Sequence, residues 1–214
     1  MQWRHIAATL ASVLLLIGCS STTGSGTLKT ETRPVSNFSA IELSGSGNLV
    51  IEQTGTESLA IEAEDNILPL LTSDVSAGTL HLGEKDNNIV METKPINYRL
   101  TVRDLRSLTV SGSGHVTAST LSAGKLNVTL SGSGGIILGG TADPQEIAIS
   151  GSGQYDATGL ASKVVTADIS GSGHAVVKTS DMLDATISGS GSLTYIGNPT
   201  VTRHISGSGS VNKQ

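Results

Sequence analysis

Three carboxylates form the densest group of side chains in the sequence that could perform acid–base chemistry or bind a metal. Glu146, Asp168 and Asp184 recur at nearby points of a repeated segment. If this segment stacks as strands, neighbouring carboxylates lie one repeat apart and two residues along, or roughly 8 Å between α-carbons. Calcium needs six to eight oxygens at ~2.4 Å, and polysaccharide-cleaving enzymes need carboxyl groups that converge on one groove. The spacing therefore favours a solvated acidic face over a metal or catalytic site.

The histidines do not form a metal site either. His115 and His174 each follow directly after a Ser-Gly-Ser-Gly motif, three repeats apart. Stacking at 4.8 Å per strand would separate them by ~14 Å, whereas zinc ligands lie ~2.1 Å from the ion. No Ser-His-Asp arrangement is indicated, and no helix pattern follows any motif as a phosphate-binding loop requires. We therefore predict no catalytic residues, no metal and no cofactor.

The elements that position these residues are set by the Ser-Gly-Ser-Gly motif, which occurs seven times. Its copies begin at Ser44, Ser111, Ser131, Ser150, Ser170, Ser188 and Ser206. From the second copy onward the intervals between starts are 20, 19, 20, 18 and 18 residues. A fixed period of this length is typical of a solenoid, in which each repeat packs against the next.

Apolar and polar residues alternate on both sides of each motif. The residue before the first serine is always aliphatic: Leu43, Val110, Leu130, Ile149, Ile169, Ile187 and Ile205. Alternation with a period of two indicates strands, and the same parity places both glycines inside and both serines outside. Parallel stacking of equivalent strands at ~4.8 Å then predicts an all-β fold, a small parallel β-helix with coils of 18–20 residues.

The predicted stack presents two outward columns of serine hydroxyls as a nearly flat array. Its central members are Ser131, Ser133, Ser150, Ser152, Ser170, Ser172, Ser188 and Ser190. Such a face could hydrogen-bond a glycan or an envelope protein. The alternative is that serine is simply the small, soluble residue that fits beside bend-forming glycines. Tyr155 and Tyr195 fall in inward columns, so we expect them in the core and not as platforms for sugars.

Residues 1–18 look like a targeting segment. Arg4 precedes an apolar run at 6–17, which ends in Gly18-Cys19 and is short for a membrane span. This resembles the lipobox of bacterial lipoproteins, which implies cleavage before Cys19, acylation of Cys19 and, with Ser20 next, the outer membrane. The alternative is an ordinary signal peptide with a chance cysteine. Lipidation would make residues 19–36 a lipidated Cys followed by a flexible, polar tether.

Residues 37–110 depart from the repeat. Alternation at 58–63, 79–82 and 96–102 predicts strands, and the segment 65–71 begins with residues that cap helices. A repeat stack needs a closed end. We therefore expect N-terminal capping strands and one short helix here, at the start of a folded domain over 37–214.

Arg203 marks the other end of the stack. It occupies an inward column that is aliphatic or alanine in every other copy. An inward charge prevents a sheet edge from pairing with another chain. We therefore expect Arg203 to cap this edge, although a long side chain near a terminus can also simply extend into solvent.

Two runs carry a family resemblance: Phe-Ser-Ala-Ile-Glu-Leu-Ser-Gly-Ser-Gly at 38–47 and Glu-Asp-Asn-Ile-Leu at 64–68. Together with the later motifs they resemble the head GIN domain family of autotransporter-adhesin heads, formerly a domain of unknown function. The resemblance covers 37–214. It implies a right-handed β-helix on a secreted or lipid-anchored envelope protein, and it brings no catalytic residues.

Charge narrows the partners. The net charge is −5, and removing residues 1–18, which hold one arginine, leaves 12 Lys and Arg against 18 Asp and Glu, or −6. This argues against nucleic acid. We expect a lipid-anchored module of the bacterial cell envelope, adhesin-like and without catalysis, bound to the membrane through its anchor and to a glycan or envelope protein. The alternatives are a carbohydrate-active β-helix enzyme and a structural protein that self-associates through its open edge.

Overall fold

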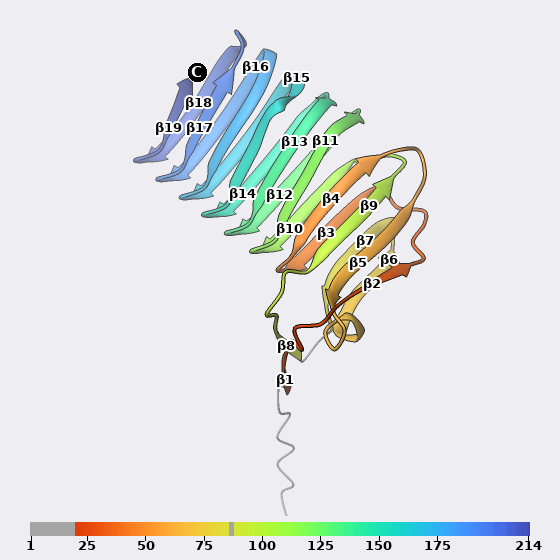
Figure 1. Ribbon diagram of the computed structural model, residues 1–214. Helices are drawn as coiled ribbons and strands as arrows, with labels where there is room; N and C mark the ends of the chain where they lie inside the picture. The colour runs from red at the N-terminus through yellow and green to blue at the C-terminus, as the bar shows by residue number, and fades with distance from the viewer. Residues whose placement is uncertain (1–19, 86–87) are drawn as a thin grey trace, which may run out of the picture.

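The computed structural model describes residues 20–85 and 88–214, which form strands and one short 3₁₀ turn (Figure 1). The signal peptide predicted at 1–18 and the lipidation site Cys19 lie outside these residues. Most strands stack in parallel into a solenoid, with an N-terminal cap of mixed strands at one end. The predicted all-β solenoid is confirmed.

Each coil of the solenoid contributes one strand before its motif and one after it. The strands before the motif, which we call wall A, are β3 (Ala40–Gly45), β10 (Ser107–Gly112), β12 (Leu126–Gly132), β14 (Gln145–Gly151), the second halves of β15 (Gln154–Gly171) and β16 (His174–Gly189), and β18 (Thr200–Gly207). The strands after it, wall B, are β4 (Asn48–Gln53), β11 (His115–Ala123), β13 (Gly135–Ala142), the first halves of β15 and β16, β17 (Ser192–Ile196) and β19 (Ser210–Lys213).

The motifs stack in register. The first serine of every copy pairs with the first serine of the next, from Ser44 through to Ser206. The aliphatic residue before that serine forms an interior column, of which Leu43, Ile169 and Ile187 are fully buried. Burying such a side chain contributes about 1.5–3 kcal/mol, so the repeated columns supply the core of the domain.

The motif is the corner at which the chain passes from wall A to wall B. Each wall-A strand ends at the first glycine, whose φ is positive, for example 113° at Gly151. A Cβ at Gly151 would lie 2.6 Å from the carbonyl oxygen of Gly132 in the preceding coil. The second glycine faces the core, where a Cβ at Gly173 would lie 2.6 Å from Ile149 Cγ2. The prediction that both glycines point inward is therefore wrong for the first, because a left-handed φ turns the chain there.

Backbone hydrogen bonds continue the ladder through this corner. The N–H of Ser152 donates to the carbonyl of Gly132 at 2.9 Å, and the N–H of Gln154 donates to Gly134 at 3.0 Å. The same pattern recurs in the later coils. Because the corner keeps its backbone groups paired, it can repeat without help from side chains.

The N-terminal end is closed by strands of both directions, as predicted. β7 (Thr79–Glu84) adds parallel to β3, and β9 (Asn97–Val102) adds parallel to β4. β6 (Leu71–Ser76) and β5 (Ser58–Glu64) then pair antiparallel with them. The short helix expected at 65–71 is only a 3₁₀ turn, η1 (Leu68–Leu70), because the chain is already extended at Leu71, where β6 begins.

The segment expected to be a flexible tether is largely part of the domain. β2 (Leu28–Arg33) pairs antiparallel with β5, and β1 (Ser20–Thr23) pairs parallel with β8 (Asn88–Met91). Arg33 donates hydrogen bonds to the carbonyls of Leu68 and Leu71, both at 2.7 Å. The sequence of β2 is polar because it is an exposed edge strand, so it lacks the apolar face by which strands are recognised.

The last described coil leaves the interior open at its end. Arg203 in β18 is in register with the buried Ala185, so it occupies the inward column as predicted. Its neighbour in the next interior column, Ile205, is 41% exposed. The proposed role of Arg203 in blocking this edge stays a prediction.

Candidate functional site

The predicted serine face lies along the motif corner. All eight serines are exposed or half-buried, and the first serine of each pair forms a continuous column from Ser131 to Ser188. Within residues 20–85 and 88–214, the hydroxyls of these eight make no hydrogen bond to another protein group. They are therefore available to solvent or to a ligand.

The two serine columns do not share one flat strand. Ser131 lies near the end of wall A, whereas Ser133 lies in the bend that follows the first glycine. The expected flat array is therefore a ridge with one column on each side of the corner. Its physical cause is the left-handed glycine between the two serines, which the parity of the sequence does not reveal.

A hollow lies beside this ridge on wall B. The outward column after the motif runs His115, Gly135, Gln154, His174 and Ser192. Because Gly135 has no side chain, the column is interrupted there, and a hollow of about 310 Å³ opens between His115 and Gln154. In the sequence, the only sign of this hollow is Gly135 itself, the one residue of the column that has no side chain.

Polar groups from three coils line the hollow. Ser133 and Ser152 border it from the ridge, and His115, Gln154 and Asp156 lie along its sides. The Asp156 carboxylate accepts hydrogen bonds from the backbone N–H of Thr158 at 2.9 Å and from its hydroxyl at 2.5 Å. These bonds fix its orientation while leaving its second oxygen without a partner inside the described chain.

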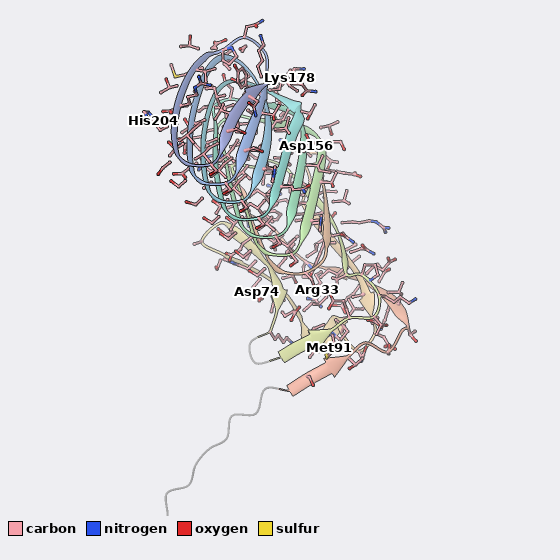
Figure 2. The ribbon with its side chains drawn as sticks, turned by 90° about the vertical axis from the view of Figure 1, so that its left-hand side faces the viewer. Arg33, Asp74, Met91, Asp156, Lys178 and His204 are labelled. Carbon is pink, nitrogen blue, oxygen red and sulfur yellow. The ribbon has the colours of Figure 1, made fainter. Side chains whose placement is uncertain are left out.

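One apolar side chain completes the lining. Ile137, also on wall B, is 54% exposed and reaches the same hollow. Hydrogen-bonding groups combined with an apolar surface suit a small polar ligand such as a sugar, whose hydroxyls need partners and whose ring carbons do not. In Figure 2 Asp156 lies on the side of the coils opposite His204, which belongs to wall A.

The acidic residues on wall A do not converge. Glu146 and Asp184 lie in one column with Thr166 between them, and Asp168 lies one coil from each and two residues along. Glu146 forms an ion pair with Lys125 at 2.6 Å. Across the described ranges, no three His, Cys, Asp or Glu side chains gather as a metal ion would require. This geometry matches the acidic face expected from the sequence.

The core contains a buried polar network that was not predicted from the sequence. Tyr155 faces the core as expected and is 1% exposed, and its hydroxyl donates to Gln145 Oε1 at 2.8 Å. The amide of Gln145 donates to Ser162, whose hydroxyl donates to the carbonyl of Ala142. Burial raises the pKa of Tyr155 far above its usual range. Gln145 was the available signal, because its column is otherwise aliphatic.

The cap contains a buried carboxylate. Glu64 is 1% exposed and accepts hydrogen bonds from the Thr93 hydroxyl at 2.6 Å, the Thr93 N–H at 2.9 Å and the Gly26 N–H at 2.5 Å. The Thr93 hydroxyl bond is the largest influence, and with the backbone donors it outweighs burial and lowers the pKa of Glu64 to about 2. Asn66 adds two bonds to the same loop, accepting from the Ser25 N–H and donating to Thr23.

Comparison with known families agrees with this architecture. The family described as "Putative auto-transporter adhesin, head GIN domain" matches residues 37–199. The chain belongs to the head GIN domain family. The matched region spans the cap strands from β5 to β9 and most of the solenoid, so the resemblance expected from 38–47 and 64–68 is confirmed.

Three solved structures similar to this head GIN chain come from Bacteroides and Parabacteroides species. One, a "putative adhesin" of Bacteroides fragilis, is 26% identical, with a TM-score of 0.75 over 90% of this chain and 100% of its own. A second "putative adhesin", from Parabacteroides distasonis, is 22% identical with a TM-score of 0.59, covering 91% and 100%. A "putative lipid binding protein" of the same species is 24% identical with a TM-score of 0.58, also covering 91% and 100%.

Two other comparisons give negative findings. No curated protein matches the chain by sequence. Among the residues that the structure describes, no helix has the length and apolar character needed to cross a membrane.

Proposed function

We propose that this head GIN domain is a lipid-anchored, non-catalytic binding module of the bacterial cell envelope that holds a neutral glycan in the hollow beside the serine ridge. The hollow at Gly135 carries the proposal. It brings His115, Gln154 and Asp156 around one recess with an exposed isoleucine. This lining can satisfy sugar hydroxyls and also contact the apolar face of a sugar ring.

Family membership supports an adhesin-like role and a surface or envelope location. A relative described as lipid-binding shares the fold at 24% identity, but the hollow has polar side chains from three coils, which suit a sugar better than an acyl chain. The carbohydrate-active enzyme is the weaker alternative. Its best carboxylates are dispersed over wall A, and one of them is paired with Lys125.

The anchor would hold the domain close to the bilayer. Cys19 immediately precedes β1, and the loop at 23–27 is tied to Glu64 and Asn66 by hydrogen bonds. Little chain would then be left to act as a spacer. Replacing Cys19 with Ser should move the full-length protein from the detergent-soluble membrane fraction to the aqueous fraction. Retention of the variant in the membrane would contradict the anchor.

A glycan-array assay on the chain without residues 1–19 tests the binding site. Gly135→Ser should fill the hollow, because a Cβ there meets only the movable ring of His115, at 3.0 Å, and no positive φ opposes it. We expect binding to a neutral glycan to fall by roughly tenfold or more, as expected when a recess that buries a ligand is occupied. Gly124→Ser is the matched control, since Gly124 is exposed with no atom within 4 Å of the new Cβ.

The same assay separates the hollow from the ridge. Changing Ser133 and Ser152 together to Ala removes the serines that border the hollow, whereas changing Ser170 and Ser188 leaves it intact. We expect only the first pair to weaken binding. Equal binding by wild type and Gly135→Ser would exclude the hollow, and equal loss in both serine pairs would assign binding to the ridge as a whole.

A further inference from the structure

A second recess lies at the opposite corner of the coils, where wall B returns to wall A. It is a groove of about 610 Å³ that crosses four successive coils. One side is the outward column Thr141, Ala161, Lys178 and Ile196, which lie in register. The other side has Asp143, Lys163, Ser180 and Asn198, and the floor includes Ser162, Thr179 and Gly197. No Ser-Gly-Ser-Gly motif marks this corner.

The two sides of the groove each present a lysine. Lys163 and Lys178 are exposed, and within the described chain their ammonium groups take part in no ion pair or hydrogen bond. They come from adjacent coils, since Ser162 pairs with Thr179 and Ala161 pairs with Lys178. Neighbouring positions of this kind lie roughly 8 Å apart between α-carbons, so both ammonium groups can reach one ligand.

The lining of the groove holds one acidic residue, Asp143, against the two lysines, so its side chains carry a net positive charge. Asp143 Oδ1 accepts hydrogen bonds from the backbone N–H groups of Lys163 and Val164, both at 3.1 Å. It therefore fixes the backbone that carries Lys163. At the far end, Lys213 donates to Asn198 Oδ1 at 2.6 Å, which adds a third cation beside the groove. The groove is thus a local positive region on a chain whose net charge is −5.

We propose that this groove binds an acidic polysaccharide, a chain of sugars that carry carboxylate groups, laid along the solenoid axis. The first and fourth coils are separated by three steps of about 4.8 Å, or ~14 Å, so the site takes an extended ligand. Lys163 and Lys178 hold its acidic groups, Thr141, Ser180 and Asn198 meet its hydroxyls, and Ala161 and Ile196 contact its ring carbons.

The geometry disfavours other polyanions. A bilayer is flat, whereas these lysines border a recess whose floor is formed by buried Ser162 and Thr179. Nucleic-acid sites combine more cations with aromatic stacking platforms. Among the described residues, the aromatic rings near this corner are Tyr155, which is buried, and Tyr195, which is half-buried, and both occupy inward columns. The inference goes beyond the proposed function, because it concerns a different ligand at a different corner. Figure 2 shows Lys178 at the edge of the coils, apart from Asp156 on wall B.

Isothermal titration with oligogalacturonate tests the groove, with the fully methyl-esterified oligosaccharide as the uncharged comparison. The double variant Lys163→Gln/Lys178→Gln should bind the acidic oligosaccharide roughly tenfold or more weakly, the scale of two lost charged contacts. Lys125→Gln is the matched control, because it removes a lysine that lies just before β12, outside the lining of the groove, and is already paired with Glu146. Wild-type affinity should fall as salt rises, since exposed charges are screened.

Several outcomes would overturn this inference: no binding of the acidic oligosaccharide, equal binding of its ester, or equal loss in Lys125→Gln. Binding of anionic vesicles that depends on the two lysines, without binding of the oligosaccharide, would replace the glycan with a lipid headgroup. Gly135→Ser should keep its affinity for the acidic oligosaccharide. Its result separates failure of the groove from failure of the hollow on wall B.

Discussion

The cap and the regular coils bury similar apolar columns but are held together in different ways. In the coils, neighbouring repeats are joined by backbone ladders that continue through the glycine corners. In the cap, backbone ladders also join the strands, but buried or half-buried charged side chains add further connections, through Glu64 to Thr93 and through Arg33 to η1. A repeated unit can rely on bonds that every residue type provides, whereas a unique junction needs particular side chains. Substitutions should therefore act differently in the two regions.

The largest effect is expected at the second glycine of a motif in the coils. Gly173→Val would place side-chain atoms within 2.6 Å of Ile149 Cγ2 and 3.1 Å of the Gly153 carbonyl. We expect the free energy of unfolding to fall by about 3 kcal/mol, the upper part of the range for overpacked cores. Urea denaturation measures it, with the exposed Gly124→Val as control. Equal stability of the two variants would contradict the close-packed corner.

The next effect concerns the cap and depends on pH. The folded pKa of Glu64 is about 2, below its ordinary 4.5, so the unfolded chain binds this proton more tightly. Its stabilisation is therefore complete above about pH 4.5 and is lost as pH falls toward 2. Glu64→Gln should lower the urea midpoint at pH 7 and flatten its decline between pH 4.5 and 2. The exposed Glu52→Gln should leave both unchanged. A parallel decline in wild type and Glu64→Gln would refute this role.

A smaller loss of stability is expected from the buried side-chain network in the coils. Tyr155→Phe would leave Gln145 Oε1 buried without its donor at 2.8 Å. An unsatisfied buried acceptor costs about 1–3 kcal/mol, and thermal unfolding should show the loss. Tyr195→Phe is the control, because this half-buried tyrosine lies in the last described coils and its hydroxyl has no partner in the described chain. If Tyr195→Phe were equally destabilising, the network would not be the cause.

The smallest effect on stability is expected at the open end. Arg203 is exposed, and Arg203→Ala should change the free energy of unfolding by no more than about 0.5 kcal/mol. Its expected effect is on association, because an apolar edge would then be free to pair with a second copy. Sedimentation velocity over a range of concentrations should show dimers in the variant alone. If Arg203→Ala stayed monomeric at every concentration, Arg203 would not be an edge cap.

Most of the solenoid could be predicted because two periods agree. The alternation of apolar and polar residues with a period of two indicates which side chains are buried, and the motif spacing indicates which coils are neighbours. Buried columns such as the one from Leu43 to Ile187 follow directly from these two periods. The shape of the corner was less predictable, because the alternation of apolar and polar residues does not reveal the positive φ at the first glycine. The edge strand β2 was missed because it has no buried face. The groove was missed because Lys163 and Lys178 meet only through the register of a corner without a motif.

The in-register column of serines has a consequence for the size of the domain. Residues 150–169 form one repeat, from Ser150 to the residue before Ser170, and these two serines lie in adjacent coils. Duplicating these residues would insert a complete coil, which presents to its two neighbouring coils the same surfaces as the original. The stack would lengthen by ~4.8 Å, while the cap and the final coil keep their contacts. The length of such a domain can therefore change only in equal steps, and the number of coils alone sets how far its outer end lies from the cap.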